Sequence, residues 1–266
     1  MATLDRRLER RRALITGGSG GLGGAIADEF ARLGAAVAIC GRDRGRLEQV
    51  AAAVSTTSGG GAVRAVTLDL VKAGAAERAV AAAADQLGGI DILVNGAGAP
   101  ADGRLEDLPG EAWRRSFEVK VFGAFDMARA ALPHLRHSKA GVIVTLSGSL
   151  GREPASGNIV SGAMNAALEN GMKALASDLA PAGIRVVTVR PGPFETERIV
   201  TMIEHRSRRE GISVAEARRL AQAAVPLARF GRPQELARLV AFVVSDDAAF
   251  LTGTVVALDG GGQRSV

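Results

Sequence analysis

The stretch T-G-G-S-G-G-L-G, residues 16–23, decides the fold of this chain. It follows a short apolar run at residues 12–15 and leads into an Ala-rich helical stretch at residues 24–33. A glycine-rich turn between a strand and a helix lets the backbone approach a ligand closely and points N–H groups of the helix start at an anion. Together with a second apolar run at residues 36–40, it predicts a βαβ unit that holds the pyrophosphate of a dinucleotide.

Short apolar runs alternate with helical segments along the rest of the chain. Most runs are near-continuous rather than alternating, which is typical of strands buried on both faces of a parallel sheet. The predicted strands lie at residues 12–16, 36–40, 62–68, 90–95, 141–146, 184–189 and 254–258. The clearest helical segments lie at residues 24–33, 45–54, 75–87, 111–135, 163–179 and 233–244. This order predicts an α/β fold, in which one domain over residues 1–266 forms a Rossmann-like, doubly wound parallel sheet with helices on both faces.

Two segments fall outside this alternation. Residues 56–61 (TTSGGG) are predicted to form a surface turn rather than a domain boundary. Residues 194–228 carry many charged side chains and lie between the sixth strand and the helix at 233–244. An insertion at the carboxyl end of such a strand lies over the ligand crevice, so this segment is predicted to be a substrate lid. An ordinary solvated helical excursion is the alternative.

Composition narrows the classes of partner. The chain has 266 residues, is 47% hydrophobic and carries a formal net charge of +5. Its arginines are spread along the chain, and no basic run is interleaved with aromatic residues, so nucleic-acid binding is not expected. The densest basic cluster, at residues 6–12, is interpreted as a solvated segment before the first strand. No apolar run has the ~18 residues that a membrane span needs, and no early stretch resembles a signal peptide. We therefore expect a cytoplasmic protein without a membrane partner.

Few residues offer metal or redox chemistry. The one cysteine, Cys40, is interpreted as a small buried residue at the end of a strand. His134 and His137 are expected at the surface near a helix end, whereas His205 lies in the predicted lid and could swing over the site. No metal site is predicted.

Five motifs follow one another along the chain. They are TGGSGGLG at 16–23, Asp69 after a strand, VNGAG at 94–98, RPGPFET at 190–196 and ALDGG at 257–261. In this order and spacing they resemble the short-chain dehydrogenase/reductase family along nearly the whole chain. The resemblance implies a nicotinamide dinucleotide cofactor, a small-molecule substrate, and a homodimer or homotetramer packed through the late helices and the last strand.

The resemblance also implies which residues hold the cofactor. Glycines of the first motif match the pyrophosphate turn, Asp69 matches the adenine contact, and residues 191–196 match the segment that holds the nicotinamide carboxamide. The family's usual second Asn in the VNGAG motif is Gly96 here. The implied cofactor residues are Gly17, Ser19, Gly21, Leu22, Gly23, Arg42, Asp69, Leu70, Asn95, Ala97, Gly98, Asn165, Pro191, Gly192 and Thr196.

The end of the second predicted strand favours NADP over NAD. An acidic residue there would accept the ribose 2′-hydroxyl and repel a 2′-phosphate. This chain has Gly41 at that position, followed by Arg42 and Arg44. Arg42 could bind the 2′-phosphate through a charge-assisted fork. The alternative is that Arg42 is simply exposed, with Asp43 capping the next helix.

The residues for proton transfer depart from the family pattern. The resemblance implies a proton relay of four residues. In it, a Tyr exchanges the substrate proton, a Lys four residues later lowers the pKa of that Tyr, a Ser orients the carbonyl and an Asn holds a water chain. Residues 166–192 match the family's late region and anchor the comparison. They place Ser161 at the Tyr position, Asn165 at the Lys position and Gly148 at the Ser position, while Lys120 stands at the Asn position. The chain contains no Tyr, so the standard relay is absent.

Three functions stay open on the sequence. The chain is an atypical carbonyl or alcohol reductase, or an inactive dinucleotide-binding sensor or assembly subunit, or, as a less favoured possibility, a scaffold. One hypothesis is that Lys120 and Asn165 have exchanged roles, with Lys120 placing an ammonium in the crevice and Ser147, Ser149 or Ser161 holding the carbonyl. The favoured alternative is that Lys120 extends to solvent. The exchange of the two residue types would then be neutral sequence drift that followed the loss of catalytic activity.

Overall fold

Seven parallel strands form the centre of the structure, in the order β3-β2-β1-β4-β5-β6-β7. The computed structural model describes residues 7–57, 63–98, 101 and 103–265. The strands are β1 (Arg12–Thr16), β2 (Ala36–Gly41), β3 (Val63–Thr67), β4 (Ile92–Asn95), β5 (Val142–Leu146), β6 (Arg185–Pro191) and β7 (Val255–Leu258). Each predicted strand is present with ends shifted by a residue or two, and the predicted α/β fold is confirmed. Most of the turn predicted at 56–61 lies outside the described residues.

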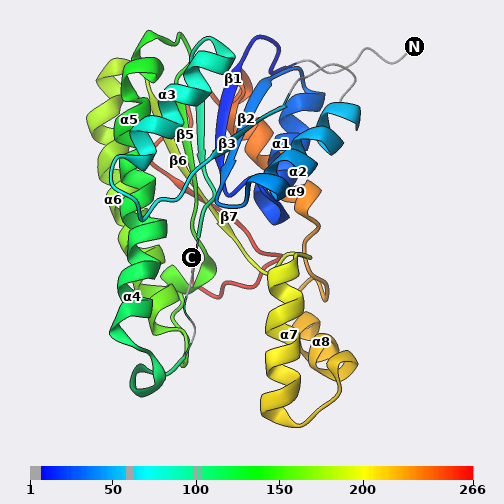
Figure 1. Cartoon of the computed structure of the whole chain (residues 1–266). Coiled ribbons are helices and arrows are strands. Elements are labelled where there is room, and N and C mark those ends of the chain that lie inside the picture. Colours follow the sequence, from blue (N-terminus) through cyan, green and yellow to red (C-terminus); the bar gives the residue numbers. More distant parts are fainter. Residues whose placement is uncertain (1–6, 58–62, 99–100, 102, 266) are drawn as a thin grey trace.

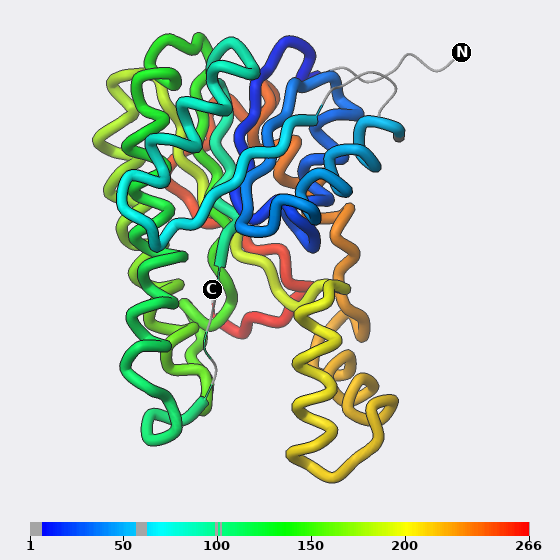
Figure 2. Tube along the Cα trace, viewed as in Figure 1, coloured from blue at the N-terminus to red at the C-terminus, as the bar shows by residue number. Residues whose placement is uncertain are grey.

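Helices cover both faces of this sheet (Figure 1). The helices are α1 (Gly21–Arg32), α2 (Arg44–Thr57), α3 (Ala75–Leu87), α4 (Gly110–Phe117), α5 (Gly123–His137), α6 (Ile159–Leu179), α7 (Glu197–Glu210), α8 (Val214–Ala223) and α9 (Pro233–Val244). Helices α1, α2 and α9 pack on one face, and α3, α5 and α6 pack on the other. The α4 region and the α7–α8 pair extend beyond the sheet on opposite sides of the C-terminal segment (Figure 2).

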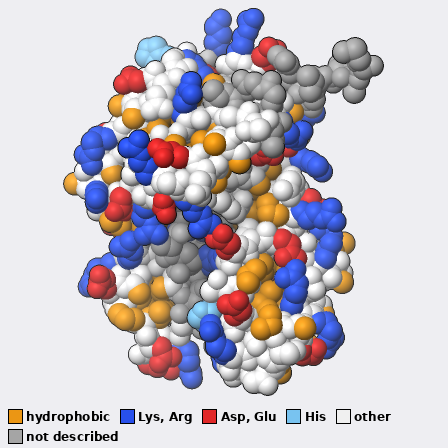
Figure 3. Space-filling model, turned by 45° about the vertical axis from the view of Figure 1, so that its right-hand side comes forward, with side chains coloured by type: hydrophobic (Ala, Val, Ile, Leu, Met, Phe, Trp, Pro, Cys, Tyr) orange, Lys and Arg blue, Asp and Glu red, His pale blue; other side chains and the backbone are white. Residues whose placement is uncertain are grey.

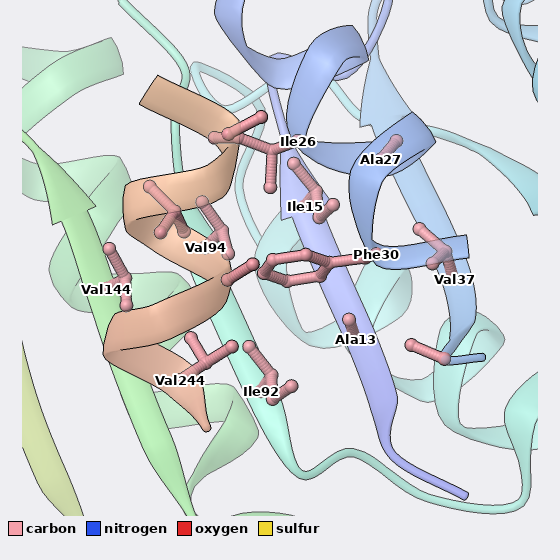
Figure 4. Close-up of a cluster of buried hydrophobic side chains, with 14 of the residues drawn as sticks. Ala13, Ile15, Ile26, Ala27, Phe30, Val37, Ile92, Val94, Val144 and Val244 are labelled. Carbon is pink, nitrogen blue, oxygen red and sulfur yellow. The ribbon is translucent and has the colours of Figure 1, made fainter. Parts of the chain in front are cut away.

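Side-chain alternation in β1 explains the two cores. Ala13 and Ile15 join the core under α1 and α9, whereas Leu14 points to the core under α3 and α5. Phe30 of α1 is fully buried, and its ring lies over the strands toward α9 (Figure 4). Burial of such a ring stabilises the fold by about 1.5–3 kcal/mol. Each face of the sheet is thus packed against its own layer of apolar side chains.

One predicted helix is interrupted at a place that matters for the site. The segment predicted as one helix over 111–135 is α4, then a π-helical turn at Glu118–Phe122, then α5. A π turn inserts an extra residue and changes the direction of the side chains in it. Lys120 lies in this turn.

The basic segment before β1 is not simply solvated. Arg12 forms an ion pair with Asp91 at 2.8 Å, and Arg11 donates to the carbonyl oxygen of Ala140 at 2.6 Å. The interpretation as a solvated segment is therefore wrong for these two residues, because long-range contacts bring acceptors to the start of β1. Cys40 is fully buried as expected, and desolvation raises the pKa of its thiol to about 12.

The exposed charges are dispersed. On the face seen in Figure 3, Lys and Arg side chains are scattered rather than gathered into one basic patch. Asp43 accepts a hydrogen bond from the backbone N–H of Arg46 at 3.0 Å and caps α2, which the sequence offered as the alternative to a phosphate-binding Arg42. No helix in the described part of the chain is long and apolar enough to cross a membrane.

Candidate cofactor and active site

A cavity of about 640 Å³ lies at the carboxyl ends of the central strands. Strand β1 lies between β2 and β4, so the strand order reverses its direction at β1. Open parallel sheets bind ligands at the carboxyl ends of the strands where the order reverses. The predicted site residues that line the cavity are Gly17, Ser19, Gly21, Leu22, Gly23, Ala97, Gly98, Lys120, Ser147, Gly148, Ser149, Ser161, Asn165, Pro191, Gly192 and Thr196. Arg42, Asp69, Leu70 and Asn95 are not among its lining residues.

The glycine turn is shaped by close backbone contacts. Gly17 has a φ of 72°, and a Cβ there would lie 2.7 Å from the carbonyl oxygen of Gly96. A Cβ on Gly23 would collide with the carbonyl oxygen of Gly17. The N-cap of α1, Gly20, offers no side chain to the first N–H groups of the helix. These groups open onto the cavity and suit the phosphates of a dinucleotide.

Two polar residues near the carboxyl ends of β3 and β4 have unused acceptors. The Oδ1 atoms of Asp69 and Asn95 are buried and have no hydrogen-bond partner among the described residues. The Nδ2 atom of Asn95 donates to the carbonyl oxygen of Ala124 at 3.3 Å and to Oγ1 of Thr145 at 3.4 Å. Asn95 thus braces β4 against α5 and β5. The free acceptor of Asp69 fits the adenine amino group that the family resemblance implies.

Arg46 lies beside the glycine turn, whereas Arg42, the residue predicted to bind the 2′-phosphate, does not line the cavity. Arg42 is exposed and does not line the cavity. Arg46, one helical turn later, does line it, and its Nε donates to the carbonyl oxygen of Ser19 at 3.0 Å. Its Nη2 donates to Glu197 at 2.5 Å. The sequence signal that could have found it is the spacing from Asp43, since the cap places Arg46 in the first turn of α2.

Lys120 points into the cavity rather than out to solvent. Its Nζ donates to the carbonyl oxygen of Ser147 at 3.0 Å. Desolvation is the main cause that lowers the pKa of Lys120 to about 7; the charge of Arg198 lowers it further, and Glu169 opposes the shift. The interpretation that Lys120 extends to solvent is therefore wrong.

The other family positions line the same cavity as this ammonium. The Nδ2 atom of Asn165 donates to the carbonyl oxygen of Ser161 at 2.8 Å, and its buried Oδ1 has no partner among the described residues. A Cβ on Gly148 would lie 2.9 Å from that Nδ2. Ser161 is buried and lines the same cavity as Ser149. The positions that the sequence comparison assigned to catalysis are thus together in space.

The sequence and the fold are similar to those of known proteins. Residues 17–263 match the family described as Enoyl-(Acyl carrier protein) reductase. 2-(S)-hydroxypropyl-CoM dehydrogenase 3 of Xanthobacter autotrophicus is 34% identical over 258 residues, which cover 97% of this chain and 98% of that protein. A short chain dehydrogenase from Burkholderia cenocepacia, solved in complex with NADP, is 33% identical with a TM-score of 0.84, over 96% of this chain and 99% of that one. The chain belongs to the short-chain dehydrogenase/reductase family.

A further solved member shows how closely the fold is shared. L-sorbose reductase from Gluconobacter frateurii, complexed with NADPH and L-sorbose, has a TM-score of 0.92 at 28% identity, over 98% of this chain and 100% of that one. As a short-chain dehydrogenase/reductase, the chain has the NAD(P)-binding Rossmann-like fold of this group of oxidoreductases.

Sequence reasoning missed an ion pair behind the site of this short-chain dehydrogenase/reductase. Arg190 donates to Glu169 through Nε at 2.9 Å and Nη2 at 2.5 Å, and both side chains are nearly buried. Ser147 donates its hydroxyl to Glu169 at 2.7 Å. That hydroxyl proton is therefore already used in a hydrogen bond to Glu169. This corrects the expectation that Ser147 could hold a substrate carbonyl.

The α7–α8 segment follows the last cofactor motif directly. Arg198, Ile199 and Met202 of α7 line the cavity, beside Glu197. Ile199 and Ile203 pack with Ala217 and Phe230 into a small separate core that holds α7 against α8. His205 is exposed and does not line the cavity. Within the described ranges, no group of His, Cys, Asp or Glu side chains is arranged to hold a metal ion.

Proposed function

We propose that this short-chain dehydrogenase/reductase is an NADP-dependent oxidoreductase that interconverts a carbonyl compound and its alcohol. The observation that carries the proposal is the continuity of the cavity. The same cavity is lined by the glycine turn at one end and by Lys120, Ser149 and Ser161 at the other. A dinucleotide held at the glycine turn would thus have its reactive end beside polar groups.

Residues of this chain fit the cofactor along that length. The N–H groups at the start of α1 face the pyrophosphate position, and a Cβ on Gly21 would lie 3.7 Å from Cγ2 of Thr196, so the two loops approach each other closely there. Asp69 offers its unused acceptor to the adenine. When bound, the nicotinamide supplies or accepts the hydride, and the chain positions the substrate carbonyl against it.

The preference for NADP rests on the charge around the adenosine end. Gly41 leaves no carboxylate at the end of β2, and Arg42 and Arg46 both lie just beyond it. Arg46 already lines the cavity and donates to the glycine turn at Ser19. The solved relatives complexed with NADPH or NADP support the same cofactor for this chain.

The test is a pair of measurements on the purified full chain. NADPH and NADH are titrated by fluorescence and by thermal shift, and NADPH oxidation is then followed with a ketose, an aldose, a 2-oxo acid, an aromatic aldehyde and 9,10-phenanthrenequinone. We expect saturable binding with NADPH tighter than NADH, and turnover of at least one carbonyl compound. Absence of binding to either nucleotide would overturn the proposal.

A dinucleotide-binding sensor or assembly subunit is the second candidate. It is favoured by the absence of Tyr from the chain and by Gly148 at the position of the orienting Ser. Tight NADPH binding without turnover of any member of the carbonyl panel would favour this function over the reductase.

Two further features belong to the same proposal. The α7–α8 segment acts as the substrate lid, since four residues of α7 line the cavity. The protein forms a homodimer or homotetramer through the late helices and β7, because β7 is an edge strand and Phe250 beside it is fully exposed. Light scattering during size-exclusion chromatography measures the mass of the assembly, and a monomer at micromolar concentration would contradict this part.

A further inference from the structure

We infer that Lys120 is the group that exchanges the substrate proton in this site, taking the role for which the family uses a Tyr. The inference rests on the proposed oxidoreductase function and adds the residue that performs its proton transfer. It is carried by the placement of the Lys120 ammonium in the cavity and by the chemistry of its neighbours.

The position of Lys120 is fixed at both ends of its side chain. The π turn at Glu118–Phe122 holds its backbone, and its Cδ lies 3.6 Å from where a Cβ on Gly98 would be. A Cβ at position 98 would meet the lysine stem at an ordinary contact distance, so the stem packs along this glycine. The Nζ atom is anchored on the carbonyl oxygen of Ser147 at 3.0 Å. This bond uses one of the three ammonium protons and leaves two for other acceptors.

Elimination among the cavity-lining residues points to the same group. The charged side chains among the described lining residues are Arg46, Lys120, Glu197 and Arg198. A guanidinium does not release its proton in proteins, which removes the two arginines. Glu197 is exposed and is paired with Arg46 beside the glycine turn. Lys120 is the remaining group that can gain and lose a proton at the polar end of the cavity.

The charges around Lys120 come from three packed elements. Glu169 of α6 attracts the ammonium, but its carboxylate is itself bound by Arg190 of β6. Arg198 of α7 repels the ammonium. Desolvation and this repulsion outweigh the attraction and lower the pKa of Lys120 to about 7. A proton donor whose pKa lies near the working pH both holds its proton and releases it readily.

The proton and electron balance of the step is simple. In the reductive direction the carbonyl carbon gains a hydride, which the reduced dinucleotide supplies, and the C=O π electrons move to the oxygen. The oxygen takes a proton from Nζ of Lys120, which becomes a neutral amine. A C–H and an O–H bond form, the product is the alcohol, and solvent returns a proton to the amine.

Substitutions separate proton transfer from a merely structural role. Lys120→Met is expected to keep NADPH affinity within about twofold and to lower turnover of the panel compound that the wild type reduces by roughly 10²–10⁴-fold. Lys120→Arg keeps the charge and can keep the hydrogen bond to Ser147, yet is expected to be about as inactive, because a guanidinium does not give up a proton. Lys72→Met, at an exposed lysine, is the matched control and is expected to match the wild type.

A measurement without catalysis tests the same group. Acetic anhydride reacts with neutral amines, and peptide mass spectrometry can follow each of the four lysines of the chain. We expect Lys120 to become reactive with a midpoint near pH 7. Lys72, Lys139 and Lys173 are exposed and serve as internal references in the same experiment.

The outcomes are distinguishable. A wild type that binds NADPH and turns over substrate, with a Lys120→Met or Lys120→Arg variant equally active, would overturn this inference alone. A Lys120 midpoint near that of the exposed lysines would also overturn it. A wild type that turns over no member of the carbonyl panel would overturn the proposed function, and this inference with it.

Discussion

Arg46 of α2 and Glu197 of α7 form an ion pair at 2.5 Å beside the glycine turn, although 151 residues separate them. The same guanidinium donates to the carbonyl oxygen of Ser19. One arginine thus connects the glycine turn to the first residue of α7, within the proposed lid. A phosphate that binds Arg46 would have to share it with Glu197.

Arg46, rather than Arg42, is expected to set the preference for NADPH. Arg46→Met should weaken NADPH binding about tenfold and leave NADH binding within about twofold, because a charge-assisted contact to the 2′-phosphate is lost. Arg42→Met is the matched control, since Arg42 is exposed and does not line the cavity. Fluorescence titrations of both nucleotides measure the effect. A larger loss for Arg42→Met would reverse the assignment.

Removing the charge of Glu197 is expected to tighten NADPH binding severalfold. Arg46 lowers the pKa of Glu197, so this carboxylate is ionised at neutral pH and competes with a phosphate for the guanidinium. Glu197→Gln ends that competition without shortening the side chain. Glu204→Gln, on the same helix and outside the cavity lining, serves as the control. Unchanged or weaker NADPH binding would show that the ion pair does not oppose the cofactor.

The free energy of unfolding should change with pH because Lys120 titrates differently in the folded and unfolded chains. Its pKa is about 7 in the folded chain and has an unperturbed value of 10.5. Between these values the unfolded chain binds a proton that the folded chain does not, so the free energy of unfolding rises with pH, by at most ~1.4 kcal/mol per pH unit. Urea unfolding of the wild type and of Lys120→Met from pH 7 to 8.5 should show this difference in slope. Parallel curves would contradict it.

Gly148 and Asn165 are expected to depend on each other. A Cβ on Gly148 would lie 2.9 Å from Nδ2 of Asn165, which is buried and bonded to Ser161. Gly148→Ala should therefore cost about 1–2 kcal/mol of stability by overpacking, and the cost should shrink in an Asn165→Ala background. Gly45→Ala is the control, because a Cβ there meets only an ordinary contact at 3.6 Å. Equal costs in both backgrounds would rule out the coupling.

Much of the fold follows from local sequence patterns. Strands such as β1, β4 and β5 are buried on both faces, so their apolar runs are continuous and easily recognised. The glycine turn at 16–23 is equally readable from its spacing, and Gly23 is required by a contact within the turn, with the carbonyl oxygen of Gly17. The family positions around Lys120 also follow from motif spacing, and the structure brings them together in one cavity.

The direction of individual side chains was harder to predict. The π turn at Glu118–Phe122 leaves no mark in the hydrophobic period, yet Lys120 lies within it. The choice between Arg42 and Arg46 depends on how α2 leaves the sheet, which residue types alone do not show. The Glu169–Arg190 pair joins a helix to a strand, and such long-range pairing is fixed only by the folded arrangement.

The central place of β1 in the sheet has a consequence for biosynthesis. β1 is made first, but its neighbour β4 and the cavity residues up to Met202 emerge from the ribosome much later. A nascent chain that ends before α7 lacks one wall of the cavity, so we expect a chain that includes α7 to hold the dinucleotide more tightly. Because a ligand stabilises the state that binds it, the cofactor would favour finished chains over truncated ones during quality control in the cell.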